Sequence, residues 1–302
     1  MIKKWMLGLL GMVSLSASAD TYTQTRYPIV LVPGVLGFQQ VFGIDYFYDI
    51  PQALSGGGAQ VFETSASALN STTARGEELL SQVEDILAVT GASKVNLIGH
   101  SHGGVSARYV AGVLPQAVAS VTTIGSPNAG TPVADVLLGV TQVPGLGQLA
   151  LSITDALASF FDIAAGTQYA ESAQAELMSM STAGQASFNA QFPAGMPSTP
   201  CGQGAGSAQG QLYFSMSGTG VWTNFLDPTD LLFGATSLAF AGAANDGLTG
   251  RCSSHFGLVL RDDYPWNHGD EINQFIGLIG WFAPDPVSVY RTQANRLKNQ
   301  GV

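Results

Sequence analysis

The segment Val95–Gly104, with the sequence VNLIGHSHGG, decides the fold of this chain. Its first residues, Val95 to Ile98, form the short apolar run of a buried strand, and the residues from about Gly103 to Val113 follow a helical pattern. Between them lies Gly99-His100-Ser101-His102-Gly103, which matches G-x-S-x-G. A serine on a sharp turn from strand to helix exposes its Oγ at the carboxyl edge of a sheet, and the glycines allow close backbone approach. We therefore predict that Ser101 is a nucleophile.

Strand and helix patterns alternate on both sides of this motif. Apolar runs predict strands at Pro28–Val32, Ala59–Glu63 and Lys94–Ile98. Between Thr72 and Val89, apolar residues recur at helical spacing, which predicts a helix that Ser71 caps and Gly91 ends. Because parallel strands need crossover connections, this order predicts an α/β fold with a mostly parallel central sheet and helices on both faces. A G-x-S-x-G serine in that context is typical of the α/β-hydrolase fold.

The rest of the chain contains a strand at Val118–Ile124, an apolar insertion and a mixed C-terminal part. The insertion, at about residues 133–200, has few charges and helical spacing from Ile153 onward, so it is either ordinary core or a helical lid over an apolar cleft. We expect one domain over residues 20–302. The further elements that we expect are strands at Gln211–Ser217, Ser237–Phe240 and Phe256–Leu260 and helices at Asp270–Phe282 and Val287–Lys298.

The N-terminus has the pattern of an export signal. Lys3 and Lys4 precede an apolar stretch, and Ala17-Ser18-Ala19 is a small-residue cleavage pattern, so residues 1–19 are predicted to be removed. The apolar stretch is too short to span a bilayer, and we expect no transmembrane segment in the mature chain. The net charge of −10 makes nucleic acid an unsuitable partner. Two cysteines in an exported chain, Cys201 and Cys252, favour a disulfide and make a poor zinc site.

A serine nucleophile needs a base and a carboxylate that orients the base. Of the four histidines, His100 and His102 adjoin Ser101 in sequence, so their side chains diverge from its Oγ. His255 precedes a predicted strand and would lie at the far end of the sheet, whereas His268 follows that strand and is the predicted base. Asp246, in Asn245-Asp246-Gly247, falls between serine and histidine as the fold requires. The rival carboxylates are Asp262 and Asp263.

The oxyanion of an acyl intermediate needs two backbone amides. One is predicted to be the amide of His102, which follows the nucleophile. The other lies in the turn Pro33-Gly34-Val35-Leu36-Gly37 after the first strand, where we choose Val35 over Leu36.

The chain resembles the Pseudomonas-type secreted bacterial triacylglycerol lipases, which depend on a foldase. The likeness runs through nearly all of the mature chain. It is carried by Tyr27–Leu31, Val95–Gly104, Thr223–Pro228, Asn245–Leu248 and Cys252–His255. The resemblance implies the triad Ser101, Asp246 and His268, a helical lid in the insertion, and a disulfide between Cys201 and Cys252.

The resemblance also implies one structural Ca²⁺ near the histidine loop. The matching positions are Asp227 and Asp270 through carboxylates, and Gln274 and Leu278 through backbone carbonyls, all of them oxygen donors that suit a hard cation. Alternatively, Asp270 caps a following helix and Asp227 opens the turn at Pro228.

Two positions depart from the family pattern. Pro33 stands where the family often has histidine, and Gly269 replaces a larger apolar residue. The cysteine pair fits the branch that needs a dedicated membrane-anchored foldase, which is the expected protein partner.

Together these features predict a secreted, extracellular enzyme that travels through the periplasm and hydrolyses long-chain acylglycerols at a lipid–water interface. The apolar insertion favours a lipase over an esterase for soluble esters, since a greasy lid opens where an apolar phase covers it. The alternatives with the same triad are an esterase, a polyester depolymerase or an acyltransferase. A lipid-binding protein without catalysis is a further alternative, which the complete set of Ser101, Asp246 and His268 disfavours.

Overall fold

The computed structural model describes residues 20–35, 40–41, 44–139 and 172–302. The predicted export signal at residues 1–19, the alternative oxyanion donor Leu36 and residues 140–171 of the predicted insertion lie outside this part. Within it, no helix combines the length and apolarity that a membrane crossing requires.

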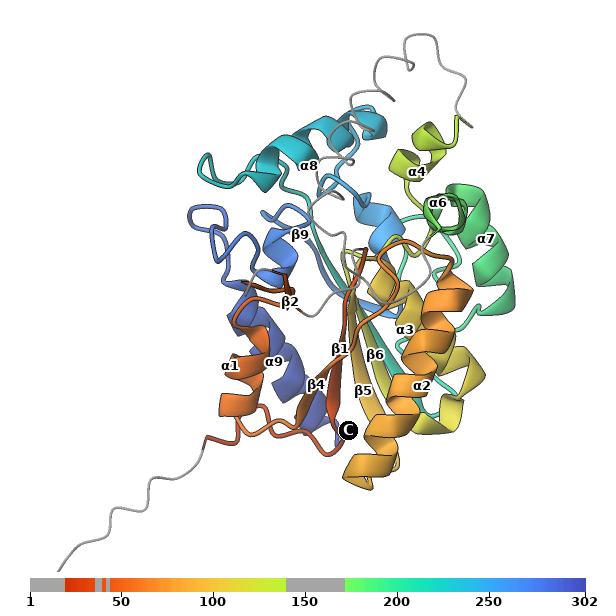
Figure 1. The fold of residues 1–302 in the computed structure, drawn as a ribbon, viewed down its shortest axis with the longest axis vertical. Helices are drawn as coiled ribbons and strands as arrows, with labels where there is room; N and C mark the ends of the chain where they lie inside the picture. The colour runs from red at the N-terminus through yellow and green to blue at the C-terminus, as the bar shows by residue number, and fades with distance from the viewer. Residues whose placement is uncertain (1–19, 36–39, 42–43, 140–171) are drawn as a thin grey trace, which may run out of the picture.

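A mostly parallel sheet forms the centre of the molecule (Figure 1). Its strands lie in the order β4-β1-β5-β6-β8, and β8 also pairs with β9 in parallel and with the short β7 in antiparallel orientation. A separate two-stranded sheet joins β2 (Gln40–Val41) to β3 (Ile44–Asp45). The strands of the large sheet are β1 (Ile29–Val32), β4 (Val61–Glu63), β5 (Val95–His100), β6 (Val118–Ile124), β7 (Ser207–Ala208), β8 (Gln211–Gly218) and β9 (Leu258–Tyr264).

Helices cover both faces of this sheet, as predicted (Figure 1). The covering helices are α1 (Ile50–Gly56), α2 (Thr72–Thr90), α3 (His102–Val113) and α9 (Pro286–Asn299). Ile29 and Leu31 of β1 point into a core shared with α1 and α9, whereas Val30 and Val32 point into a core shared with α2 and α3. This alternation is the period of a strand that is buried on both sides.

The ends of α2 are formed by the residues that the sequence indicated. The Ser71 side chain accepts a hydrogen bond from the Ala74 amide, and Gly91 ends the helix in the left-handed conformation. Side-chain capping by Ser and a left-handed C-terminal Gly each satisfy backbone groups that the last turns leave unpaired.

Further helices lie above the carboxyl ends of the strands (Figure 1). In the described parts of the predicted insertion they are α4 (Pro132–Leu137), α6 (Ala173–Met180) and α7 (Thr182–Gln191), and after β8 comes α8 (Thr229–Ser237). Short 3-10 turns are η1 (Pro115–Ala117), η3 (Leu238–Phe240), η4 (Arg251–Ser254) and η5 (Asp270–Ile272). Cys201 and Cys252 form a disulfide across a sequence separation of 51.

Two predicted elements are wrong and one is shifted. Ser237–Phe240 is the end of α8 followed by η3, because the buried Phe233, Thr236 and Phe240 follow helical spacing. Asp270–Phe282 contains only the turn η5. Several of its residues, with Ile276 and Phe282 among them, have positive φ, which an α-helix excludes. The strand predicted at Phe256–Leu260 begins at Leu258 and ends at Tyr264.

Candidate active site

Ser101 occupies the turn between β5 and α3, as the motif predicts. Its backbone has φ 55° and ψ −132°, a conformation that non-glycine residues rarely adopt. Its amide donates to the Ile124 carbonyl of β6 at 2.9 Å. A Cβ at Gly103 would lie 2.2 Å from the Val32 carbonyl oxygen, so only glycine allows α3 to start this close to β1. The turn therefore places Ser101 at the carboxyl edge of the sheet.

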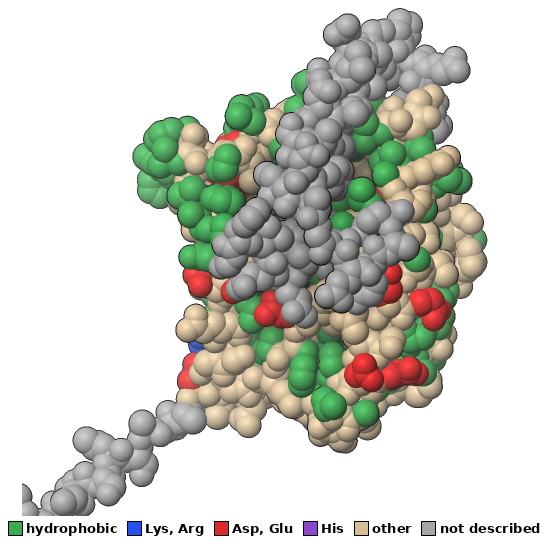
Figure 2. All heavy atoms as spheres, in the orientation of Figure 1, with side chains coloured by type: hydrophobic (Ala, Val, Ile, Leu, Met, Phe, Trp, Pro, Cys, Tyr) green, Lys and Arg blue, Asp and Glu red, His purple; other side chains and the backbone are tan. Residues whose placement is uncertain are grey.

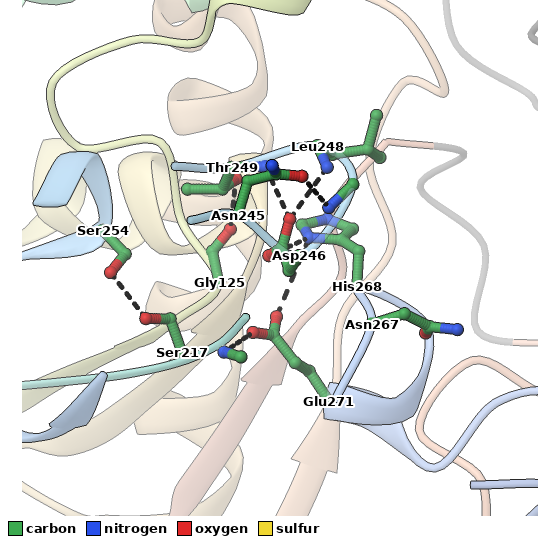
Figure 3. Close-up of polar contacts among 12 residues, drawn as sticks. Gly125, Ser217, Asn245, Asp246, Leu248, Thr249, Ser254, Asn267, His268 and Glu271 are labelled. Atoms are coloured by element: carbon green, nitrogen blue, oxygen red, sulfur yellow. Dashed lines mark hydrogen bonds and ion pairs between the residues drawn. The ribbon is translucent and has the colours of Figure 1, made fainter. Parts of the chain in front are cut away.

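His268 and Asp246 form a buried pair on two loops beyond the same edge (Figure 3). Nδ1 of His268 donates to Oδ2 of Asp246 at 2.8 Å, and the His268 amide donates to the Asp246 carbonyl at 2.8 Å. The other carboxylate oxygen accepts the amides of Leu248 at 2.8 Å and Thr249 at 2.6 Å. Bonds from three donors fix the direction in which Asp246 faces His268.

The alternative base and carboxylates are engaged elsewhere. Nδ1 of His255 donates to the Gly202 carbonyl at 2.9 Å, and its Nε2 lies 2.9 Å from Asp262. Asp262 also pairs with Arg251, and Asp263 pairs with Arg261. Because Asp262 and Asp263 already have these partners, Asp246 is the only one of the three aspartates that pairs with His268 among the described residues.

The two histidines beside Ser101 belong to separate buried clusters. Nδ1 of His102 lies 2.7 Å from a carboxylate oxygen of Glu176 on α6, and its Nε2 lies 2.9 Å from Thr72 Oγ1 on α2. His100 turns the other way, with its Nδ1 2.8 Å from the Tyr46 hydroxyl. Burial lowers the pKa of both imidazoles, and that of His100 falls well below its usual value.

The turn that carries Val35 is fixed by two side chains that the sequence did not single out. The guanidinium of Arg75, from α2, donates to the carbonyls of Pro33 at 3.0 Å and Gly34 at 2.5 Å. The Gly34 amide donates to the Tyr46 hydroxyl at 2.9 Å. A Cβ at Gly34 would lie 2.6 Å from the Ser101 Cβ, so this turn packs directly against the serine. Arg75 could have been found from the sequence, because it lies four residues before Leu79 on the apolar stripe of its helix.

Glu271 is a further buried carboxyl that the sequence analysis missed. It follows His268 by three residues, and Figure 3 shows it below the His268–Asp246 pair. Its Oε1 accepts the Gly218 amide at 2.6 Å, and its Oε2 lies 3.2 Å from His100 Nε2 and 3.8 Å from His268 Nδ1. Burial first, and then the charge of Asp246, hold the pKa of Glu271 well above its usual value.

Two of the predicted calcium ligands, Asp227 and Asp270, belong to a cluster of acidic side chains beside the histidine loop. Asp227 and Asp270 are both buried, and so is Asp230, which the sequence analysis did not consider. Burial, with smaller contributions from the charges of Asp227 and Asp230, raises the pKa of Asp270 to about 7. The side-chain amide of Gln274 donates to the carbonyls of Asp45 and Tyr46. Leu278 lies on the same loop and is half-buried.

A second group of possible metal ligands lies at the catalytic edge. Within the described ranges, one ligand atom each of His100, His268 and Glu271 lies within 4.8 Å of the others, and all three residues are buried. This group differs from the predicted calcium positions. Because it contains the histidine that pairs with Asp246, we treat it as part of the candidate active site.

Comparisons with known proteins identify the family of this chain. A family profile described as the alpha/beta hydrolase fold matches residues 27–272. A protein of Vibrio cholerae named triacylglycerol lipase is 49% identical over 287 residues, covering 94% of this chain and 92% of the relative. Proteins with the same name from Burkholderia plantarii and Pseudomonas fragi are 40% and 38% identical and cover 95% and 94% of this chain. These alignments span 90% and 100% of the two relatives.

Among solved structures, the mature form of the Bacillus licheniformis lipase BlEst2 has a TM-score of 0.61 at 20% sequence identity, with 90% of this chain and 92% of that chain covered. At this identity the likeness concerns the fold. This chain therefore belongs to the α/β-hydrolase family and, within it, to the family of bacterial triacylglycerol lipases, which confirms the resemblance seen in the sequence.

The raised pKa of Glu271 generates a prediction. We expect Glu271→Gln to keep activity within about threefold, because Gln offers Gly218 the same carbonyl oxygen and an N–H in place of the carboxyl O–H. A carboxyl whose pKa rises on folding stabilises least at high pH: the parent loses stability as pH rises above about 4.5, the ordinary value for Glu. Between pH 5 and pH 9, the free energy of unfolding measured in urea should therefore fall more for the parent than for Glu271→Gln. An equal change in the free energy of unfolding for both proteins would contradict a protonated Glu271.

Proposed function

We propose that this chain is an exported triacylglycerol lipase in which Ser101 is the nucleophile, His268 the base and Asp246 the carboxylate that orients it. The observation that carries this proposal is the buried His268–Asp246 pair, which lies beyond the same sheet edge that presents Ser101 on its strained turn. The names of relatives that are 38% to 49% identical support acylglycerols as the substrate class.

The first half of the reaction forms an acyl-enzyme. Because Nδ1 of His268 donates to Asp246, Nε2 is the nitrogen that takes the Ser101 proton as Oγ attacks the ester carbonyl. The resulting oxyanion accepts hydrogen bonds from the amides of Val35 and His102 in this proposal. Arg75 and Tyr46 would keep the first donor in place, since they fix the turn on both sides of Gly34.

The second half releases the fatty acid. His268 gives its proton to the departing glyceride oxygen as the tetrahedral intermediate collapses. It then takes a proton from water, whose oxygen attacks the acyl carbon, and returns that proton to Ser101 Oγ. Asp246 stabilises the imidazolium in both halves, and its two bonds to backbone amides hold it in place.

Two sets of variants test this assignment. Ser101→Ala should lower hydrolysis of emulsified long-chain triacylglycerol by about 10⁴-fold or more, and Asp246→Asn by about 10³- to 10⁴-fold, because each removes one member of a unit that acts together. Asp262→Asn is the matched control: it changes the rival aspartate, which pairs with His255 and Arg251, and should keep activity within about twofold. Titration of released fatty acid measures all three.

The results of these assays distinguish the lipase from the alternative functions. If the parent ignores the emulsion and cleaves short soluble esters, the protein is an esterase and the lid proposal falls with the lipase. If Ser101→Ala keeps the parent rate on every ester, the triad is wrong. Product analysis with polyester and with alcohol acceptors identifies a depolymerase or an acyltransferase.

We also propose that one Ca²⁺ binds at the acidic cluster, held by the carboxylates of Asp227 and Asp270 and the backbone carbonyls of Gln274 and Leu278. The fit rests on Asp270: its Oδ1 is buried and receives no hydrogen bond from the described residues. Burial also raises the pKa of Asp227, so neighbouring carboxylates lie out of water together. A hard cation would coordinate the unpaired oxygen and offset the repulsion between the neighbouring carboxylates. The ion would hold the loop that follows His268.

Chelation tests the calcium proposal. Addition of EGTA should lower the melting temperature by about 5–10 °C, the shift expected when a tightly bound ligand of the folded state is removed, and excess Ca²⁺ should restore it. Asp270→Asn should abolish this response, whereas Asp263→Asn, on an exposed ion pair, should keep it. A melting temperature that EGTA leaves unchanged contradicts the site.

The proposal includes export and a folding partner. Residues 1–19 would direct the chain to the periplasm and be removed, and a membrane-anchored foldase would assist folding before secretion, with the Cys201–Cys252 disulfide formed on the way. Expression with and without the foldase of a related lipase, followed by assay of the medium, tests this step. Equal extracellular activity in both cases would remove the need for the partner.

A further inference from the structure

Large apolar side chains crowd on one exposed surface outside the predicted insertion. We call it the aromatic surface and define it as Trp222, Phe225, Leu226, Leu231, Trp281 and Phe282. Phe225 is 81% exposed and Phe282 is fully exposed. In Figure 2 hydrophobic side chains gather at the upper left of the molecule, where Figure 1 places α8 and its flanking loops. A patch of this kind on a protein surface marks an interaction site.

Buried polar groups hold the loops of this surface in place. Asp230 accepts the amides of Thr223 at 2.9 Å and Asn224 at 3.0 Å. The Asn224 side chain donates to the Ile279 carbonyl at 3.0 Å, which ties the first loop to the loop that carries Trp281. The Trp281 ring centroid lies 6.1 Å from that of Phe225. The exposed rings therefore project from an ordered scaffold, and little ordering is left for a binding partner to impose.

The two segments that form the aromatic surface carry no exposed charged side chain. Between Thr219 and Asn245 the only charged residues are Asp227 and Asp230, both buried, and Ile272–Pro284 contains none. Binding to an anionic membrane relies on clustered Lys and Arg, and protein interfaces surround their apolar core with a polar rim. The whole chain carries a net charge of −10, which opposes an anionic surface further. Exposed Trp and Phe without charges suit the boundary between water and an uncharged lipid.

The scaffold of the aromatic surface also contacts the candidate active site. Leu231 of α8 faces solvent, whereas Phe233 on the opposite side of the helix is buried with its ring centroid 6.0 Å from that of His268. The Asn267 side chain, next to His268, donates to Asp230 at 2.8 Å. The elements that present the exposed rings thus pack directly against the histidine, and docking through them would bring the catalytic edge to the lipid.

We propose that the aromatic surface docks the protein onto an uncharged lipid–water interface, independently of the insertion at residues 133–200. This inference rests on the proposed lipase function. It names α8 and the loop before Asp285 as the fixed anchor that adsorbs to the droplet.

Adsorption is measured on Ser101→Ala protein, so that hydrolysis does not alter the lipid. The probe is a triolein emulsion coated with phosphatidylcholine, and the variant is Phe225→Ser with Phe282→Ser. Loss of two exposed aromatic anchors should weaken adsorption by about tenfold or more. The matched control is Val89→Ser, because Val89 is 77% exposed on α2, away from the surface, and should adsorb like the parent.

A second measurement, of tryptophan fluorescence, keeps an aromatic ring at every position of the surface. Quenching of tryptophan fluorescence by brominated phosphatidylcholine in the emulsion should be strong in the Ser101→Ala parent. It should fall severalfold when Trp222 and Trp281 are replaced by Phe in protein that begins at Asp20, since Trp5 is then absent and Trp266 is buried. Equal quenching in both proteins overturns the proposal.

Activity on a soluble short-chain ester separates this inference from the proposed function. With Ser101 present, the Phe225→Ser, Phe282→Ser protein should keep the parent rate on that ester and lose emulsion hydrolysis. If the parent with Ser101 hydrolyses neither the soluble ester nor the emulsion, the proposed function falls while adsorption is still decided on its own. If adsorption is unchanged and light scattering shows that the substitutions dissociate a dimer, the surface binds a second copy and the inference is wrong.

Discussion

The close approach of three backbone segments around Ser101 constrains everything else at the catalytic edge. Because Gly103 lies against β1 and Gly34 lies against the serine itself, the turn after β1, the end of β5 and the start of α3 share one small volume. Backbone amides can gather there only if no Cβ intervenes. The positive φ of Ser101 is maintained by this packing, and the charged Arg75 beneath the turn satisfies carbonyls that would otherwise be buried without partners.

The polar side chains beside this turn are buried, and their burial determines how they interact with His268. Asp246 is completely buried, and its two oxygens accept hydrogen bonds from two backbone amides and from Nδ1 of His268. The neighbouring Glu271 and His100 are held toward their neutral forms by the same burial, which keeps additional charges away from the pair. Of the two carboxyl groups near this imidazole, Asp246 accepts three hydrogen bonds, whereas burial holds Glu271 toward its neutral form.

One acidic cluster connects this site to the surface above it. Asp230 holds the loop that presents Trp222 and receives a hydrogen bond from Asn267, the neighbour of His268. Asp270, whose Oδ1 is unpaired among the described residues, follows the histidine by two positions. The position of the base, a hard-cation site and an exposed aromatic face would therefore depend on the same few loops, which is the physical reason for treating them as one functional region.

The sequence by itself determined the features that are encoded locally: the strand, turn and helix around Ser101, and α2 with its cap at Ser71 and its end at Gly91. Apolar periodicity, capping side chains and glycine act within a few residues, so no distant contact is needed to read them. The ordered sequence of Ser101, Asp246 and His268 also allowed the buried pair to be anticipated. The irregular course of Asp270–Phe282, the burial of Arg75 and the position of Glu271 beside His100 were decided only by the tertiary structure. Each of these depends on partners far away in the chain, and neither helical spacing nor local propensity contains that information.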